Sequence, residues 1–370
     1  MFLNAYQGKR VLVTGHTGFK GTWMCEWLSL LGAEMHGYAL DPAPHAVLFD
    51  QVKLQQRMCS DTRADLADGV RLARIIADLE PDFIFHLAAQ PLVRHSYRHP
   101  VDTFVTNVIG TIHVLEAVRA AKLRCVTICV TTDKCYENDG RVRGYEESDP
   151  MGGHDPYSAS KGCAELAIAS YRRSFFSNGM GAKLASARAG NVLGGGDWSE
   201  DRVIPDCIRA LSRGGTVQIR NPQAIRPWQH VLEPLSGYLH LAARLATERD
   251  RAANEIQDEG LCSAFNFGPA RSSCRSVAQV VEEVFRHWPG KLVVGRPAED
   301  FHEAAKLELC TAKAARQLSW APVWSFEKTI ENTVTAYRYM LEGGRVDSIL
   351  RSQIENYVAV ARDLRMPWCG

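Results

Sequence analysis

The sequence predicts an α/β protein with a doubly wound parallel sheet and a smaller C-terminal region. Short apolar runs rich in β-branched residues alternate with helical patterns, as expected for consecutive βαβ units. The runs are continuously apolar, which is typical of strands that helices cover on both faces. The expected strands span 10–14, 34–39, 82–88 and 125–131, and the expected helices span 22–31, 101–121 and 156–176.

The composition is that of an ordinary globular protein. The chain has 370 residues, of which 46% are hydrophobic and 23% are charged, and its length suggests about two domains. A formal net charge of +1 argues against nucleic acid or an anionic membrane as the main partner. Because no stretch has the roughly 18 uninterrupted apolar residues of a membrane span, and the first ten residues contain no long apolar segment, we expect a cytoplasmic protein.

The eleven cysteines are an odd number and include no C-x-x-C pair. Metal sites need clustered ligands at set spacings, so we interpret these residues as reduced core thiols rather than disulfides or zinc ligands. His95 and His99 are four residues apart, but no third ligand stands beside them. We therefore expect no metal site.

The first expected strand runs directly into a G-x-x-G-x-x-G turn formed by Gly15, Gly18 and Gly21. Glycines are needed where such a turn is tight and where backbone approaches a pyrophosphate at a helix N-terminus. A plain glycine turn is the alternative, but the strand–turn–helix context favours a Rossmann-type dinucleotide site. The other turn residues expected to contact the cofactor are Thr17, Phe19 and Lys20.

Two acidic residues farther along the chain, one after the second strand and one between the second and third units, are candidates for the adenosine half of the cofactor. Asp41 follows the second strand about 20 residues past the last glycine, where a carboxylate can accept from a ribose 2′-hydroxyl, which favours NAD over NADP. Asp61, beside Thr62, is a candidate for the adenine amino group. The alternatives are a solvated turn for Asp41 and a helix N-cap for Asp61.

Tyr157 and Lys161 form a Y-x-x-x-K pair that a helix places on one face. A cation beside a phenol favours the phenolate, so we expect Lys161 to lower the pKa of Tyr157 and make it a base for a sugar hydroxyl. The pair alone occurs often by chance. It becomes specific together with the glycine turn and with the run from Thr131 to Lys134 at the end of the preceding strand.

These motifs resemble those of the extended short-chain dehydrogenase/reductases, and within them the nucleotide-sugar 4,6-dehydratases. The resemblance is closest to the branch that acts on CDP-glucose, and it is strong over residues 11–235 and looser beyond. The segments that carry it are GHTGFKGTWMCEWL (15–28), HLAAQPLVRHSY (86–97), TTDKCYEN (131–138), DPYSASKGCAEL (155–166), RAGNVLGGGDW (188–198) and RPWQHVLEPL (226–235).

The resemblance implies an NAD-dependent dehydration in which the hydride taken from C4 of the sugar returns to C6. It implies that Tyr157 is the base for the 4-hydroxyl and that Lys161 tunes it and holds the nicotinamide ribose. It further implies that Thr132 bonds the 4-oxygen and that Asp133 protonates the departing 6-hydroxyl. A role in deoxysugar biosynthesis, such as that of lipopolysaccharide O-antigen, follows from the same resemblance.

One position departs from the dTDP-glucose type of dehydratase, which carries a glutamate where this chain has Lys134. A lysine can take the C5 proton only when it is neutral. We favour Lys134 as this base because the CDP-glucose branch shares the Asp-Lys pair. Glu137 is the alternative base, and a Lys134 that merely pairs with Asp133 is the structural alternative.

The resemblance and the chemistry of phosphate recognition name further residues. Arg202 and Arg226 are candidates for the substrate pyrophosphate, since a planar guanidinium suits paired phosphate oxygens, although each can equally be an ordinary surface or packing residue. The other expected substrate residues are Gln90, Arg94, Asn191 and Trp198. The remaining expected cofactor residues are Leu87, Ala88, Ala89 and Thr106.

The alternation of strands and helices ends near residue 191, and glycine- and proline-rich sequence follows. We expect residues 1–190 to form the NAD-binding domain and 191–370 the substrate-binding region. Within this second region a helix is expected at 204–211 and a strand at 217–220. A strand at 265–268, before a helix at 276–287, indicates a return to the first domain near 215–270 and a discontinuous boundary.

Two other functions stay open at this point. A 4-epimerase or decarboxylase of the same family shares the glycine turn and the Tyr-Lys pair but has no use for the Asp133-Lys134 pair. A non-enzymatic dinucleotide sensor would be expected to lack the Tyr-Lys pair. The helices at 101–121 and 156–176 resemble those that form a four-helix bundle between subunits, which implies a homodimer or a dimer of dimers.

Overall fold

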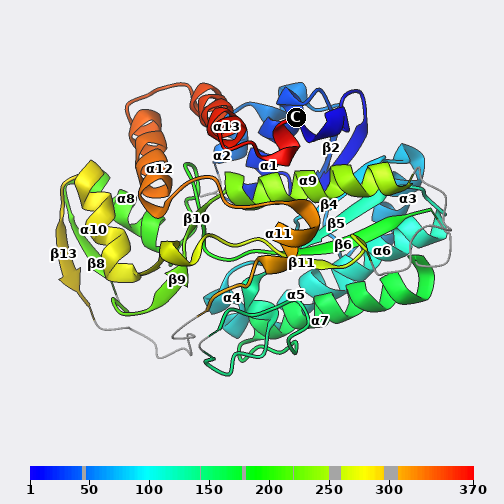
Figure 1. Cartoon of the computed structure of the whole chain (residues 1–370), viewed down its shortest axis with the longest axis horizontal. Helices are drawn as coiled ribbons and strands as arrows, with labels where there is room; N and C mark the ends of the chain where they lie inside the picture. Colours follow the sequence, from blue (N-terminus) through cyan, green and yellow to red (C-terminus); the bar gives the residue numbers. More distant parts are fainter. Residues whose placement is uncertain (44–46, 142, 177–180, 220, 250–259, 296–306) are drawn as a thin grey trace.

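A seven-stranded sheet whose neighbouring strands all run parallel forms the centre of the molecule (Figure 1). It is seen in a computed structural model that describes residues 1–43, 47–141, 143–176, 181–219, 221–249, 260–295 and 307–370. The strand order is β11-β6-β5-β4-β1-β2-β3. The strands are β1 (Arg10–Thr14), β2 (Glu34–Ala39), β3 (Ser60–Arg63), β4 (Phe83–His86), β5 (Val126–Val130), β6 (Lys183–Arg188) and β11 (Ala264–Asn266).

The doubly wound parallel fold predicted from the sequence is confirmed. β1 lies between β2 and β4, and Thr14 at its end is level with Tyr38 on one side and His86 on the other. The first two strands have the predicted bounds, whereas β4 and β5 are shorter than predicted because their flanking residues already belong to the loops. The strands β3 and β6 were not individually predicted.

β11 joins the sheet from a distant part of the chain. Its residues pair in parallel with β6, from Ala264 opposite Ser186 to Asn266 opposite Arg188. The chain therefore returns to the edge of the main sheet after it has formed part of a second group of elements. The expected return near 215–270 includes residues 220 and 250–259, which lie outside the described residues.

Helices cover both faces of the sheet (Figure 1). Successive residues of a strand point to opposite faces, so Val11 and Val13 pack into one buried cluster and Leu12 packs into another. The first face carries α1 (Phe19–Leu30) and α9 (Leu232–Arg249). The second face carries α3 (Gly69–Leu79), α6 (Gly110–Ala120) and α7 (Pro156–Tyr171).

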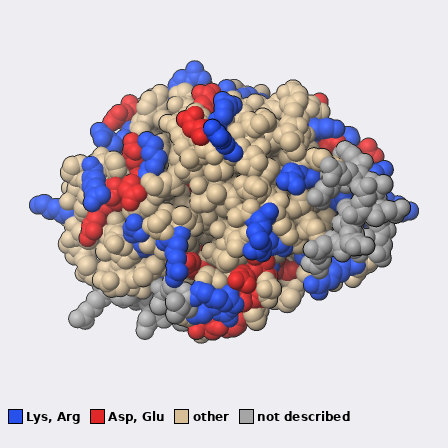
Figure 2. All heavy atoms as spheres, viewed as in Figure 1, with Lys and Arg blue, Asp and Glu red and all other residues tan. Residues whose placement is uncertain are grey.

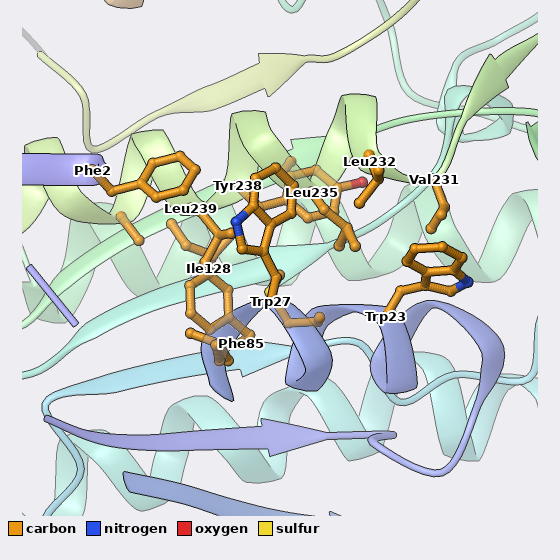
Figure 3. Close-up of a cluster of buried hydrophobic side chains, with 14 of the residues drawn as sticks. Phe2, Trp23, Trp27, Phe85, Ile128, Val231, Leu232, Leu235, Tyr238 and Leu239 are labelled. Carbon is orange, nitrogen blue, oxygen red and sulfur yellow. The ribbon is translucent and has the colours of Figure 1, made fainter. Parts of the chain in front are cut away.

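The larger buried cluster lies between α9, α1 and the sheet (Figure 3). Trp23 and Trp27 of α1, Leu235 and Tyr238 of α9, and Ile128 of β5 are all fully buried. Aromatic side chains bury large apolar areas and dominate the energetics of such a core. This packing fixes α9 along one face of the sheet.

A second group of elements lies beside the sheet and has its own buried cluster. The pairs β8–β13, β7–β10 and β9–β12 form small two-stranded sheets. The group comprises β7 (Val192–Leu193), α8 (Val203–Ser212), β8 (Thr216–Ile219), β9 (Ile225–Pro227), β10 (Gln229–His230), β12 (Cys274–Ser276), α10 (Val277–His287), β13 (Lys291–Val294) and α12 (Phe326–Leu341). The remaining helices are α2 (Leu48–Gln51), α4 (Val93–Arg98), α5 (Pro100–Phe104), α11 (Ala312–Leu318) and α13 (Val346–Asp363).

The helical stretch 100–120 joins α5, a π-helical turn η3 (Val105–Ile109) and α6. It is the one helix among the described residues that is long and apolar enough to cross a membrane, and 44% of its most apolar stretch is buried inside the protein. Its buried side packs on α3 and α7. Basic and acidic side chains are interspersed over the face seen in Figure 2.

Candidate active site

The functional residues predicted from the sequence gather at the carboxyl ends of β1, β4 and β5. In open parallel sheets this edge is where ligands bind, because the loops that follow the strands form a crevice there. The glycine turn follows β1, residues 87–90 follow β4, and the run from Thr131 to Lys134 follows β5. The catalytic candidates on α7 face the same edge.

The glycine turn has the conformation that a close backbone approach requires. Gly15 has a φ of +74°, and a Cβ there would lie 2.7 Å from the Cα of Ala88. A Cβ at Gly21 would overlap the carbonyl oxygen of Gly15. Gly18 is the N-cap of α1 and provides no side-chain cap, so the first N–H groups of α1 face the turn.

Two other predicted cofactor residues make hydrogen bonds close to this turn. The N–H of Ala88 donates to Oγ1 of Thr14 over 3.3 Å, and the hydroxyl of Thr17 donates to the carbonyl of Leu40 over 3.1 Å. The remaining predicted cofactor residues are Leu87 and Ala89, which follow β4, Thr62 in β3 and Thr106 in η3.

The two predicted acidic residues have different surroundings. The side chain of Asp41 is 86% exposed and lies 3.7 Å from Arg63. The side chain of Asp61 is 6% exposed and already bonded, because His16 contacts its Oδ1 over 2.8 Å and Arg63 donates to its Oδ2 over 2.8 Å. Burial lowers the pKa of His16 while Asp61 raises it.

Helix α7 presents the Tyr157–Lys161 pair to the site. Asp155 caps this helix by accepting from the N–H of Ser158 over 2.9 Å, and Pro156 occupies its first position. The spacing of four residues places Tyr157 and Lys161 on one face, and both side chains are buried. The ammonium of Lys161 donates to the carbonyl of Val130 at the end of β5 over 3.4 Å.

The expectation that Lys161 lowers the pKa of Tyr157 is wrong for this structure. Burial raises the pKa of Tyr157 to about 12, and a hydrogen bond with Thr132 and the charge of Arg202 oppose this rise. Burial also lowers the pKa of Lys161 to about 8. The reason is geometric, since the ammonium reaches back toward β5 and desolvation outweighs the charges around the phenol.

Thr132 and Asp133 form the polar end of β5. Thr132 is the N-cap of a short 3₁₀ turn, η4 (Asp133–Cys135), and its hydroxyl donates to Oδ1 of Asp133 over 3.0 Å. The other carboxyl oxygen, Oδ2, is buried and has no hydrogen-bond partner among the described residues. Burial raises the pKa of Asp133, and the charges of Lys134 and Arg226 oppose this rise.

Lys134 and Glu137, the two candidate bases, differ in position. Lys134 is partly buried and its charge acts directly on Asp133. Glu137 is exposed, and a Cβ at Gly152 would overlap its carboxylate, so this side chain lies against the Gly152 backbone. Only Lys134 of the two therefore lies beside the buried acid.

Basic residues from other elements complete the site. The charge of Arg202, which precedes α8, acts on Tyr157 and on Lys20 of α1, and the charge of Arg226 in β9 acts on Asp133. Arg202 also pairs with Asp197 over 3.0 Å. Burial together with the neighbouring charges of Arg202 and Lys161 lowers the pKa of Lys20 to about 7.

The other predicted substrate residues are less directly connected. The side-chain amide of Gln90 is used within its own loop, where it donates to the carbonyl of Leu92 and to Thr103. Arg94 lies 3.6 Å from Asp201, and the ring of Trp198 packs edge-on against Tyr337 in the second group of elements.

Asn191 has a left-handed backbone with a φ of 44°, and its buried Nδ2 has no partner among the described residues. This combination of an uncommon backbone and an unsatisfied donor is typical of functional positions.

Two residues at the site were missed by the sequence reasoning. A Cβ at Gly190 would overlap Oδ2 of Asp133, so only glycine leaves room for this carboxyl. Tyr238 of α9 is fully buried, and the charges of Asp133 and Tyr157 act on its phenol. Periodicity assigns Tyr238 to a helix core and gives no sign that Asp133 and Tyr157 lie near it, whereas Gly190 lies in a segment that carries the family resemblance.

A family model described as GDP-mannose 4,6 dehydratase matches residues 12–333. The chain belongs to this family. Its predicted resemblance to the 4,6-dehydratases is thereby confirmed. Within the family, the chain is 44% identical over 363 residues to CDP-glucose 4,6-dehydratase of Salmonella typhimurium, covering 96% of this chain and 98% of the relative. It is also 25% identical over 348 residues to a probable dTDP-glucose 4,6-dehydratase of Sinorhizobium fredii, covering 90% and 93% of the two chains.

Solved structures share the fold of this family member. UDP-glucose 4-epimerase of Thermotoga maritima, solved with UDP-glucose, superposes with a TM-score of 0.74 at 24% identity, covering 90% of this chain and 99% of the other. The dTDP-glucose 4,6-dehydratase of Bacillus anthracis, solved in complex with NAD, gives a TM-score of 0.73 at 19% identity, covering 92% and 100%. At these identities the likeness shows the fold alone.

Proposed function

We propose that the protein is a CDP-D-glucose 4,6-dehydratase, which converts CDP-glucose to CDP-4-dehydro-6-deoxy-D-glucose and water with NAD as a bound hydride carrier. The observation that carries this proposal is the 44% identity to CDP-glucose 4,6-dehydratase of Salmonella typhimurium over nearly the full length of both chains. The contacts among Thr132, Asp133 and Tyr157 support it, because a dehydration needs an acid as well as a base.

The residues around the glycine turn fit a dinucleotide. The uncapped N-terminus of α1 offers N–H groups to a pyrophosphate, and the close approach of Gly15 to Ala88 leaves a backbone surface without side chains. Asp41 or Asp61 would meet the adenosine half, with Thr62 beside them, and residues 87–89 and Thr106 would line the nicotinamide half. When bound, NAD would supply the group that accepts the hydride from C4 and returns it to C6.

The oxidation step uses Tyr157 as its base. Its phenolate takes the proton of the 4-hydroxyl as the hydride leaves C4, and Thr132 bonds the same oxygen. Because burial keeps the phenol protonated, the base needs a nearby positive charge, which Arg202 and the oxidised nicotinamide would together provide. Lys161 would hold the nicotinamide ribose.

The elimination step uses Asp133 and Lys134. Burial favours the protonated form of Asp133, which suits a general acid for the departing 6-hydroxyl. Lys134 in its neutral form takes the C5 proton, which the adjacent 4-keto group has made acidic. The position of Glu137 against Gly152 supports Lys134 rather than Glu137 as this base.

Substrate recognition is assigned to the region after residue 190. Arg202 and Arg226 would bind the pyrophosphate, because both lie close enough to the catalytic residues for their charges to act on them. Asn191, Arg94, Gln90 and Trp198 are proposed as further substrate contacts. The domains are then residues 1–190, with a return near 215–270, for the cofactor and residues 191–370 for the substrate.

The protein is proposed to be a cytoplasmic homodimer. All eleven cysteines are free thiols, as expected in a reducing compartment. Apolar side chains are exposed on the helices that would form the interface, among them Val101 at 72%, Ile109 at 42% and Leu166 at 60%. A dimer of dimers and a place in O-antigen deoxysugar synthesis are suggested only by the resemblance.

The test of this function is incubation of the purified protein with CDP-glucose in deuterated water, followed by mass and proton analysis of the product. A dehydratase gives loss of one water and deuterium at C5. A retained 6-hydroxyl with inverted C4 would identify a 4-epimerase instead, and an unchanged substrate would refute both.

A further inference from the structure

Two buried polar atoms, one on the proposed acid Asp133 and one on Tyr238, have no hydrogen-bond partner among the described residues. Among the described residues, neither Oδ2 of Asp133 nor the hydroxyl of Tyr238 has a hydrogen-bond partner, and the two side chains are 1% and 0% exposed. Leaving a buried polar group unbonded destabilises a fold, so such groups are rare and are often completed by a ligand or a water.

Several relations place Tyr238 at the site. The charges of Asp133 and Tyr157 act on its phenol, and both add to the effect of burial in raising its pKa. The ammonium of Lys20 lies 5.7 Å from the centre of its ring, and the charge of Asp133 acts on Lys20 as well. Tyr238 therefore shares its surroundings with the acid, the base and a lysine of the glycine turn.

The ring of Tyr238 does not need its hydroxyl to pack. It lies in the buried cluster between α9 and the sheet (Figure 3), with Phe267 edge-on to it at 5.6 Å between ring centres. A phenylalanine would fill this space without burying an unbonded hydroxyl. The hydroxyl is thus a cost to stability that packing does not explain, and stability given up at one position is typical of function.

The nearby Tyr6 provides a contrast. It is also buried in the same cluster, and its hydroxyl donates to the carbonyl of Leu239 over 2.6 Å. Tyr238, the residue just before Leu239 on α9, has the same type of side chain, but its hydroxyl makes no such bond among the described residues. The difference separates a structural tyrosine from one whose hydroxyl is left for another partner.

We infer that Tyr238 is a further catalytic residue, whose hydroxyl binds the C6 oxygen of the sugar beside Asp133 as that oxygen leaves. This inference rests on the proposed function. In the elimination, the C5–H bond breaks, its proton passes to neutral Lys134, and its electron pair forms the C5=C6 double bond. The C6–O bond breaks with its pair on oxygen, which takes the proton of Asp133 and departs as water. Tyr238 holds the oxygen before and after this transfer.

The variant Tyr238→Phe tests the inference by separating oxidation from elimination. In a single turnover with CDP-glucose, the absorbance of reduced nicotinamide first rises with oxidation and then falls after elimination. We expect the rise to stay within about twofold of the wild type and the fall to slow about 100-fold, as when one donor to a developing charge is removed. The melting temperature should be unchanged or higher.

Tyr6→Phe is the matched control, because it removes a hydroxyl from the same cluster without touching the site. It should lower the melting temperature and leave both phases unchanged. The inference is overturned if Tyr238→Phe eliminates as fast as the wild type, or if it lowers the melting temperature and slows both phases equally. A wild-type protein that releases no 6-deoxy product would instead refute the proposed function itself.

Discussion

The hydroxyl of Thr132 donates a hydrogen bond to Oδ1 of Asp133 over 3.0 Å, and the same hydroxyl is hydrogen-bonded to the phenol of Tyr157. One side chain thus connects the proposed acid with the proposed base. All of these groups are buried, so their relative positions depend on protein contacts rather than on solvent. Changing Thr132 should therefore affect both half-reactions.

Thr132→Val keeps the shape of the side chain and removes its hydroxyl. We expect kcat to fall about 100-fold, because a hydrogen bond to the 4-oxygen and the orientation of Asp133 are lost together. Thr132→Ser should recover most of this loss. Steady-state kinetics with CDP-glucose measure both, and a valine variant as active as the serine variant would contradict the assigned role.

Lys134→Ala should leave the first oxidation intact and stop the loss of water. Removal of a general base typically costs about 100-fold or more, so bound reduced nicotinamide should accumulate while 6-deoxy product does not appear. Glu137→Gln is the paired comparison and should change the elimination rate little, since Glu137 lies against Gly152. The opposite ranking of the two variants would assign the C5 base to Glu137.

Gly190→Ala should inactivate the enzyme without unfolding it. A Cβ at this position overlaps Oδ2 of Asp133, so the carboxyl must move, and a displacement of about 1 Å in an active site can cost about 100-fold in rate. Gly295→Ala is the control, because a Cβ there meets nothing within 4 Å. Product formation and circular dichroism distinguish loss of activity from loss of fold.

Acidification should destabilise the protein through its buried histidines. Burial lowers the pKa of His230 to about 3, so between pH 6.5 and 3 the unfolded chain binds a proton that the folded one does not. The free energy of unfolding therefore decreases as the pH is lowered, by up to about 1.4 kcal/mol per pH unit for this group. Burial raises the pKa of Glu233 to about 7. Between its ordinary pKa and pH 7 this group has the opposite effect, because the folded chain holds a proton there that the unfolded chain does not.

His230→Phe isolates the histidine contribution. Urea titrations between pH 6 and 4 give the free energy of unfolding at each pH. Its slope against pH should be smaller in this variant than in the wild type by up to about 1.4 kcal/mol per pH unit. His99→Gln is the control, because the His99 side chain is 51% exposed. Equal slopes in the wild type and His230→Phe would show that His230 titrates normally in the folded state.

Leu166→Glu should convert the proposed dimer into monomers. Leu166 lies on the outer side of α7 and is 60% exposed, and a charge at the centre of an apolar interface is costly to desolvate. Leu364→Glu, at a position 52% exposed just beyond α13, should leave the assembly unchanged. Sedimentation velocity of the two variants decides between them, and dimers in both would place the interface elsewhere.

Much of the sheet was predictable because its signals are local. A continuous apolar run, Val11–Val13, identifies β1, and the glycine turn after β1 marks the ligand edge. β3 and β6 were missed individually because Ser60–Arg63 is polar and Lys183–Arg188 contains small residues, so both depend on their neighbours in the sheet.

The residues of the site were predictable only where they belong to motifs. Tyr157 and Lys161 are close in sequence, but the pKa of Tyr157 depends on desolvation, which no spacing reveals. Gly190 lies against Asp133, and the charge of Asp133 acts on Tyr238, only because distant segments of the chain meet. The sequence pattern therefore predicts the chemistry of the site better than its electrostatics.

The pairing of β11 with β6 constrains how such a protein can evolve. A gene cut anywhere between the codons for residues 193 and 263 would separate the sheet from its last strand and leave β6 as an open edge, which invites aggregation. The two regions are therefore inherited as one piece. Recombination that exchanges substrate preference between relatives must replace an internal segment and leave residues 264–266 where they are.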